Sequence, residues 1–129
     1  MTPLSRHRIL VVDDEQDILD ILHEHFAKEC DVETAADGMT ALASVRARRP
    51  DVIFLDINMP GINGVDVLKS VKELDATIPV LMITANADNA LAAEAIKRGA
   101  FSYVPKPFDL KYLNHLVAAA LSSRADRTR

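Results

Sequence analysis

One stretch of this chain constrains its fold more than any other. Residues 52–55 are four large apolar residues that run without a break into Asp56, and Pro60-Gly61 follows shortly after. A continuous apolar run of this length, ended by proline and glycine, predicts a β-strand buried on both faces. Asp56 therefore stands where a core strand leaves the core. A carboxylate is costly in such a place unless its charge is compensated, so we expect the rest of the chain to supply its partners.

The rest of the chain alternates between strand patterns and helix patterns. Apolar or alternating runs predict strands at residues 9–12, 31–35, 52–56, 80–83 and 101–104. Apolar residues at three- and four-residue spacing predict helices at about residues 18–26, 41–49, 65–74, 91–98 and 110–121. Asp14 is expected to cap the first of these helices and Asp88 the fourth. The alternation predicts an α/β fold, in which helices cover both faces of a parallel sheet.

The composition of the strands also predicts their order in the sheet. The first, third and fourth strands are wholly apolar and should be central, whereas the second and fifth are mixed and should lie at the edges. The order 2-1-3-4-5 satisfies both conditions. It is the order of the flavodoxin-like fold, a doubly wound five-stranded parallel sheet in a three-layer α/β/α arrangement.

Composition narrows the kinds of function to consider. The 129 residues, 49% of them hydrophobic, fit one domain with a single core. The net charge of −4 offers no basic face for nucleic acid, and the apolar runs are too short to span a membrane or act as a signal peptide. The single cysteine, Cys30, excludes an internal disulfide and fits a reducing compartment. We therefore expect a cytoplasmic protein that binds neither nucleic acid nor membrane.

Polar side chains stand at the carboxyl end of four predicted strands. In a doubly wound sheet these ends border the binding crevice, where the winding direction reverses. The side chains that should meet there are three acids, a hydroxyl and an ammonium: Asp13, Asp14, Asp56, Thr84 and Lys106. At about 4 Å and an effective dielectric constant near 20, each pair of like charges costs on the order of 4 kcal/mol, which one lysine does not offset.

A divalent cation would relieve this repulsion. An acidic site made only of oxygen ligands suits Mg²⁺ best, and Mn²⁺ can substitute for it. A cation there would also bridge an incoming phosphoryl group. Asp56 could then act as an oxygen nucleophile on phosphorus, while Thr84 and Lys106 bind the equatorial oxygens of the phosphoryl group. The residues thus predict a site for phosphoryl transfer.

At these residues the sequence resembles the response-regulator receiver domain of two-component signal transduction, in the chemotaxis-regulator-like superfamily. The resemblance runs from Ile9 to about Leu121. The segments that carry it are residues 9–15, Asp56 with Met59-Pro60 and Gly64, Thr84-Ala85, and residues 103–108. Together these segments are highly specific, although each alone would be weak.

The resemblance implies a role for each site residue. Asp56 would be the phosphoacceptor, Lys106 the phosphate-binding lysine, and Thr84 and Tyr103 the pair that switches. Asp14, Asp56 and the backbone carbonyl of Asn58 would bind Mg²⁺ directly, with Asp13 acting through a metal-bound water. Asn58 and Asn86 would flank the path of the hydrolysing water and tune the lifetime of the phosphate. The family's cis peptide bond would fall at Lys106-Pro107.

The resemblance also implies partners and boundaries. A sensor histidine kinase or a phosphotransfer protein would donate the phosphoryl group, and the protein would be a regulator, not an enzyme, catalysing only its own phosphorylation and dephosphorylation. The changed surface of the fourth helix, fifth strand and fifth helix would control an effector or an output domain, or form a homodimer. We expect an N-terminal extension at residues 1–7, the receiver domain at 8–122 and a polar tail or linker at 123–129.

Other interpretations use the same residues differently. Asp13 and Asp14 could only cap a helix, Thr84 could open one, Lys106 could be a solvated loop lysine, and Tyr103 could be a packing residue. A phosphatase of the haloacid-dehalogenase type would need a second acid where the chain has Asn58. A flavin carrier would not place acids after its first strand, because they repel phosphate. An interaction module without phosphoryl turnover remains the third alternative.

Overall fold

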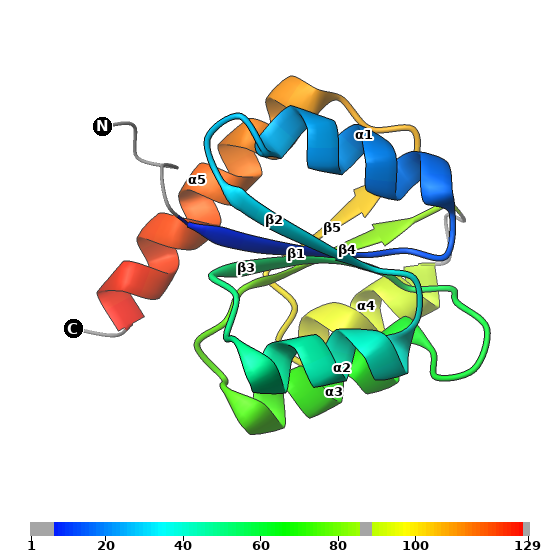
Figure 1. The fold of residues 1–129 in the computed structure, drawn as a ribbon. Coiled ribbons are helices and arrows are strands. Elements are labelled where there is room, and N and C mark those ends of the chain that lie inside the picture. The colour runs from blue at the N-terminus through cyan, green and yellow to red at the C-terminus, as the bar shows by residue number, and fades with distance from the viewer. Residues whose placement is uncertain (1–6, 86–88, 128–129) are drawn as a thin grey trace.

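Five parallel strands form one sheet in the order β2-β1-β3-β4-β5 (Figure 1). The computed structural model describes residues 7–85 and 89–127. The strands are β1 (Arg8–Val12), β2 (Asp31–Ala35), β3 (Val52–Asp56), β4 (Val80–Thr84) and β5 (Ser102–Pro105). The α/β fold and the strand order predicted from composition are both confirmed. The last strand begins at Ser102 rather than at Phe101, whose side chain is exposed.

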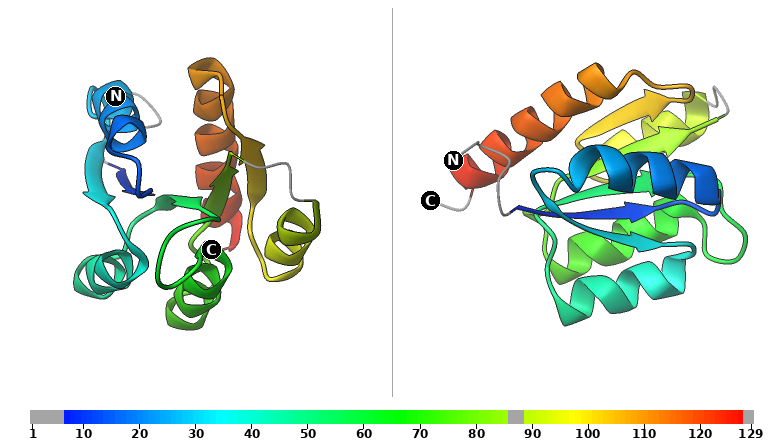
Figure 2. Two further views of the ribbon diagram at one scale, coloured as in Figure 1. Left: turned by 90° about the vertical axis from the view of Figure 1, so that its right-hand side faces the viewer. Right: turned by 45° about the horizontal axis from the view of Figure 1, so that its top comes forward.

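Five helices among the described residues cover the two faces of the sheet. They are α1 (Gln16–Phe26), α2 (Gly38–Ala47), α3 (Gly64–Leu74), α4 (Asn89–Lys97) and α5 (Leu110–Arg127). Helices α1 and α5 lie on one face, and α2, α3 and α4 lie on the other (Figures 1 and 2). The result is the three-layer arrangement expected of a doubly wound sheet. None of the described helices combines the length and the apolarity needed to cross a membrane.

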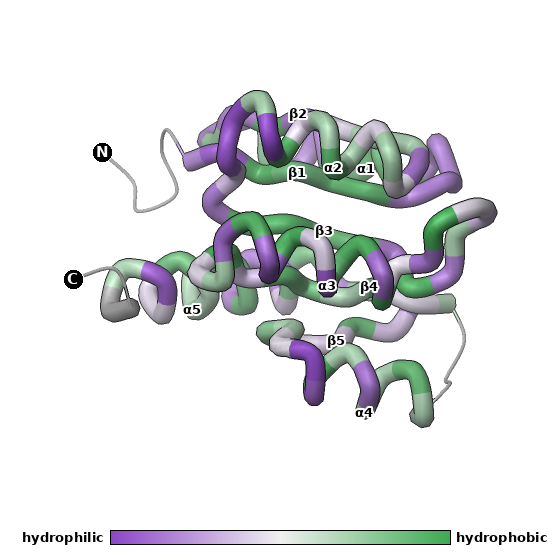
Figure 3. The backbone as a smooth tube through the Cα atoms, turned by 90° about the horizontal axis from the view of Figure 1, so that it is seen from below, coloured by the Kyte–Doolittle hydropathy of each residue, from purple (hydrophilic) through white to green (hydrophobic). Residues whose placement is uncertain are grey.

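The strand side chains alternate between two hydrophobic clusters, one on each face. Leu10, Ile53 and Met82 pack beneath α2, α3 and α4, whereas Ile9 and Phe54 pack beneath α1 and α5. Every residue of β3 and β4 is buried, and these strands are apolar on both faces apart from Asp56 and Thr84 at their carboxyl ends. Figure 3 shows the hydrophobic colour concentrated along the strands and polar colour recurring around the helices. The burial of both faces holds the strand ends at fixed positions.

The residues that cap the helices agree only in part with those predicted from the sequence. The side chains of Asp37 and Asn63 accept hydrogen bonds from the backbone N–H groups of Thr40 and Asp66, as capping residues do. The prediction that Asp14 caps α1 is wrong, because the position before that helix belongs to Glu15, whose side chain makes no capping bond. Asp88, predicted to cap α4, lies outside the described residues.

An ion-pair cluster at the amino edge of the sheet fixes the far end of α5. Arg124 Nη1 lies 2.6 Å from Asp51 Oδ1, just before β3, and Arg124 Nη2 lies 3.6 Å from Asp75 Oδ2, just after α3. Arg49 lies 3.5 Å from the same oxygen of Asp75. The backbone N–H of Arg8 donates to the other Asp51 oxygen at 2.8 Å. The cluster ties α5 to the edge opposite the one where the acidic residues gather.

Candidate functional site

The carboxyl ends of β1, β3, β4 and β5 bring the predicted site residues to one edge of the sheet. Asp13 and Asp14 directly follow β1, Asp56 is the last residue of β3, Thr84 ends β4, and Lys106 follows β5. Ligand oxygens of Asp13, Asp14 and Asp56 all lie within 4.8 Å of one another. Residues distant in the chain therefore meet because parallel strands all end at the same edge.

Asp56 is a buried carboxylate with few compensating contacts. The residue is 3% exposed. Its Oδ1 accepts a hydrogen bond of 3.1 Å from the backbone N–H of Asn58, and its Oδ2 lies 3.7 Å from Lys106 Nζ. Burial raises the pKa of Asp56 to about 7, and the nearby charge of Asp13 adds to the shift, although Lys106 opposes it. The ionised form of Asp56 is therefore destabilised in this site, and a bound cation would stabilise it.

Lys106 is shared among three carboxylates. Its ammonium lies 2.9 Å from Asp13 Oδ2, 3.6 Å from Glu15 Oε1 and 3.7 Å from Asp56 Oδ2. The side chain is 10% exposed. Burial alone lowers the pKa of Lys106, but the contacts with Asp13, Asp56 and Glu15 raise it above its ordinary value. Lys106 is consequently a fixed positive charge at the edge of the site.

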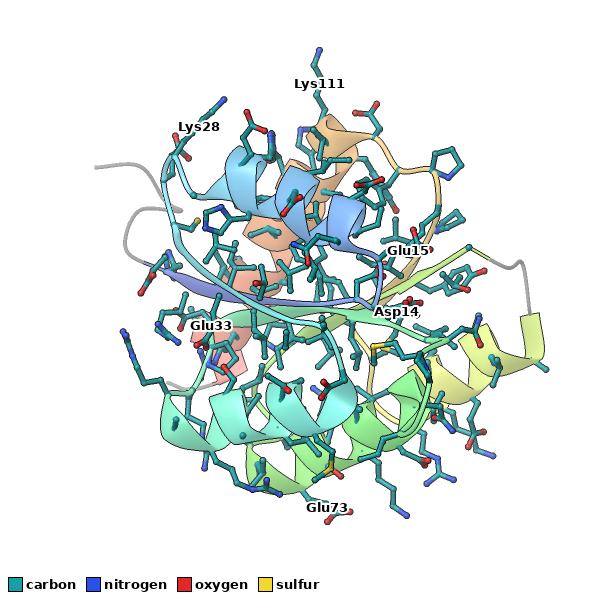
Figure 4. All side chains as sticks on the ribbon, turned by 45° about the vertical axis from the view of Figure 1, so that its right-hand side comes forward. Asp14, Glu15, Lys28, Glu33, Glu73 and Lys111 are labelled. Atoms are coloured by element: carbon teal, nitrogen blue, oxygen red, sulfur yellow. The ribbon has the colours of Figure 1, made fainter. Side chains whose placement is uncertain are left out.

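The two acids after β1 differ in exposure. Asp13 is fully buried, and its Oδ1 accepts a hydrogen bond of 2.9 Å from the backbone N–H of Glu15. Its Oδ2 lies 2.9 Å from Lys106 Nζ, which is its charged partner among the described residues. Asp14 is exposed (Figure 4). Three carboxylates whose oxygens lie within 4.8 Å of one another, with one ammonium between them, fit a hard divalent cation such as Mg²⁺.

A glycine, Gly64, allows the loop after β3 to pack closely against the backbone of Asp56 and Ile57. The backbone N–H of Gly64 donates to the carbonyl of Ile57 at 2.8 Å. A Cβ atom on Gly64 would collide with the carbonyl oxygen of Asp56 and lie 2.6 Å from Ile57 Cα. Only a residue without a side chain permits this approach, and it sets the direction of the chain through Asn58, whose backbone carbonyl is a predicted metal ligand.

Thr84 and Tyr103 lie on neighbouring strands. Thr84 is 1% exposed, and its carbonyl accepts a hydrogen bond of 2.7 Å from the backbone N–H of Lys106. Tyr103 pairs with Met82 across the ladder between β4 and β5. Its ring is half-buried and packs against the hydrophobic cluster beneath α2, α3 and α4. The two side chains thus lie on adjacent strands, with Thr84 at the carboxyl end of β4.

Three further predictions concern Asn58, Asn86 and the peptide bond at Lys106-Pro107. Asn58 is exposed just past Asp56. Asn86 lies outside the described residues. The predicted cis bond at Lys106-Pro107 is confirmed.

Sequence reasoning missed one residue of the site. The sequence predicts no role for Glu15, yet its carboxylate lies 3.6 Å from Lys106 Nζ. The acidic run after β1 gave a usable signal, since three successive acids after a strand exceed what helix capping needs. The direction of the third side chain depends on which residue caps the helix, and the predicted cap, Asp14, is one residue before the observed one, Glu15.

Comparisons with known proteins agree with this arrangement. The family model for the response regulator receiver domain matches residues 9–118. The regulatory protein AtoC of Escherichia coli (strain K12) is 41% identical over 116 residues, which cover 89% of this chain. That match covers 25% of AtoC, so the chain spans about a quarter of this relative.

Solved structures share the fold across almost the whole chain. The receiver domain of NtrX from Brucella abortus is 36% identical with a TM-score of 0.84, over 88% of this chain and 98% of that domain. A CheY-like receiver domain protein from Methanospirillum hungatei JF-1 is 26% identical with a TM-score of 0.89, over 95% of this chain and 99% of that one. Fold, site and family model thus lead to one conclusion: the chain belongs to the response regulator receiver domain family of two-component systems.

Proposed function

We propose that this protein is a phosphorylation-dependent switch whose acceptor is Asp56. The observation that carries the proposal is the position of the Asp56 carboxylate, at the sheet edge, between two further carboxylates and the Lys106 ammonium. The donor would be the phosphohistidine of a sensor histidine kinase or of a phosphotransfer protein. A bond forms between an Asp56 oxygen and phosphorus while the bond between the donor nitrogen and phosphorus breaks, and the histidine leaves with the electron pair.

Each neighbouring residue has a part in this transfer. Lys106 and the Thr84 hydroxyl would bind the phosphoryl oxygens as their charge redistributes. Asp14, Asp56 and the carbonyl of Asn58 would hold Mg²⁺ or Mn²⁺, with Asp13 acting through a bound water. When bound, the cation supplies positive charge that neutralises the carboxylates and the phosphoryl oxygens. The burial of Asp13 and Asp56 keeps these charges in a low dielectric, where they act strongly.

The proposed output is a change in the surface made by α4, β5 and α5. Phosphorylated Asp56 would draw the Thr84 hydroxyl toward the phosphoryl oxygens, which frees space for the ring of Tyr103 to turn inward. The phosphate can shift this equilibrium only by its different contacts in the two states, on the order of a few kcal/mol. The changed surface would control an effector or an output domain, or pair two copies of the chain.

Thr84→Ala is expected to separate phosphorylation from output. Removing the hydroxyl takes away the group that the phosphoryl oxygens would draw in, so the change in partner binding on phosphorylation should fall by about 1–2 kcal/mol, or about 5- to 30-fold. The measurement is the affinity of an identified partner, or the dimerisation constant, with and without the phosphoryl group. Thr84→Ser keeps the hydroxyl and serves as the matched control. If phosphorylation still changed binding fully in Thr84→Ala, the proposed coupling would be wrong.

Asn58 and Asn86 are proposed to tune the lifetime of the phosphate. Asn58 lies exposed two positions past Asp56, where its amide could order or obstruct a water that attacks phosphorus. Dephosphorylation rates of Asn58→Ala and Asn86→Ala should both differ from the wild-type rate. Unchanged rates in both variants would remove this role.

The proposed function is tested by the intact mass of the protein after treatment with acetyl phosphate. We expect the mass of one phosphoryl group to be added to wild type with Mg²⁺, little without Mg²⁺, and none to Asp56→Asn. Asp51→Asn, altered at the opposite end of β3, should be labelled as wild type is. Absence of label in wild type would instead favour an interaction module without phosphoryl turnover, and labelling of Asp56→Asn would place the acceptor elsewhere.

The proposal also covers the location of the protein, its domain boundaries and the reactions that it catalyses. We place the protein in the cytoplasm, with the receiver domain at residues 8–122 and a tail or linker at 123–129. It would catalyse only its own phosphorylation and dephosphorylation. Regulatory relatives such as AtoC are much longer than this chain, which spans about a quarter of AtoC.

A further inference from the structure

We propose that Glu15 determines which phosphodonors reach Asp56, by slowing transfer from small anionic donors. The inference rests on the proposed function, because it concerns the phosphorylation of Asp56. It adds a residue to which neither the motif nor the predicted metal site gives a role.

Glu15 stands on the solvent side of Lys106. The two side chains form an ion pair with 3.6 Å between Oε1 and Nζ. The Glu15 side chain is 57% exposed, whereas that of Lys106 is 10% exposed and that of Asp56 is 5% exposed. Figure 4 shows Glu15 where β1 passes into α1, next to Asp14. A negative charge therefore lies at the rim of the site, outside the buried groups that are to meet the phosphoryl group.

The Glu15 side chain makes few contacts that stabilise the fold. It occupies the capping position of α1 but accepts no capping hydrogen bond. The hydrogen bond from Glu15 to Asp13 is made by the backbone N–H, which any residue other than proline would keep. The ion pair with Lys106 is the side chain's only ion pair among the described residues. Replacing the carboxylate should consequently leave the fold and the geometry of Asp13 intact.

The same carboxylate opposes a phosphodonor in two ways. Asp56 is nearly buried, so a small donor must approach it from the exposed rim, where its negative phosphoryl oxygens are repelled by Glu15. Glu15 also competes for Lys106, the cation that those oxygens are proposed to contact. A docked protein donor gains binding energy from surfaces remote from the transfer, whereas a small molecule has no such compensation. Glu15 would thereby favour a docked phosphohistidine over free phosphorylated metabolites.

The test compares labelling rates of wild type and Glu15→Gln with two donors at saturating Mg²⁺. The probes are dianionic acetyl phosphate and phosphoramidate, whose protonated nitrogen reduces its negative charge. At low ionic strength Glu15→Gln should raise the acetyl phosphate rate about 2- to 5-fold and the phosphoramidate rate clearly less. The gain should shrink as KCl rises from about 50 mM to about 500 mM, because salt screens exposed charges. Intact mass over time gives each rate.

Asp17→Asn is the matched control. Asp17 is an exposed acid in the first turn of α1, two residues after Glu15, and it forms no ion pair with Lys106 in the described part of the chain. Its removal changes the net charge equally and should leave the ratio of the two donor rates unchanged. An unchanged or slower acetyl phosphate rate in Glu15→Gln, or an equal gain for both donors, would overturn the inference. Failure of wild type to be labelled by either donor would instead count against the proposed function.

Discussion

Asp56→Asn is expected to stabilise the protein by about 2–4 kcal/mol at about pH 8 in the absence of Mg²⁺, even though it removes the proposed acceptor. The reason is the raised pKa of Asp56, about 7 in the folded protein against an ordinary value of 3.8. At this pH the wild-type protein must hold a buried charge beside Asp13, which asparagine does not carry. Chemical unfolding of both proteins measures the difference.

The sign of the pH dependence follows from the direction of that shift. Between the two pKa values the folded protein binds the proton of Asp56 more readily than the unfolded chain does, so this group lowers stability as pH rises. The advantage of Asp56→Asn should be small near pH 4, grow through the interval up to about pH 7 and level off above it. Asp14→Asn is the control, because Asp14 is exposed and its removal should give a smaller gain. A difference that did not change with pH would contradict the proposed cause.

Gly64→Ala is expected to lower the free energy of unfolding by about 2–4 kcal/mol and to slow labelling of Asp56. The added Cβ would collide with the backbone carbonyl of Asp56 and lie 2.6 Å from Ile57 Cα. Because both atoms belong to the backbone, the whole loop after β3 must shift, and it would carry Asp56 with it. Chemical unfolding and the acetyl phosphate rate measure the two effects.

Gly61→Ala is the matched control for this loop. Gly61 has a φ of +81°, which an alanine adopts at a cost of about 1–2 kcal/mol, but nothing lies within 4 Å of an added Cβ there. It should therefore destabilise the protein less than Gly64→Ala and leave labelling closer to wild type. If both variants behaved alike, backbone conformation and not the close approach beneath Asp56 would explain the effect.

The sequence was sufficient to predict the architecture because each strand has a distinct pattern. The apolar runs that became β1, β3 and β4 are buried on both faces, and the mixed pattern of β2 and β5 matched their place at the edges. Once the order was known, the meeting of Asp13, Asp56 and Lys106 followed from the common direction of the strands. These predictions depend on periodicity and topology, which a sequence expresses directly.

Features set by a single boundary or a single side-chain direction could not be predicted in the same way. The start of α1 differs from the prediction, so Asp14 is an exposed residue of the site and not a cap, and Glu15 turns toward Lys106. The cluster around Arg124 joins residues 73 positions apart, and no periodic pattern connects them. A long charged side chain can pair with any of several neighbouring groups, and which pair forms depends on the tertiary structure.

We propose that the acidic edge of the sheet lacks positive charge, that a divalent cation supplies it, and that the bound cation prepares Asp56 for phosphorylation. Chemical unfolding of wild type and Asp56→Asn at about pH 8, in MgCl₂ or in NaCl of equal ionic strength, tests it most directly. Near-saturating Mg²⁺ is expected to stabilise wild type by about 1–3 kcal/mol and Asp56→Asn by clearly less. An equal gain in both proteins, or no gain in wild type, would contradict the claim.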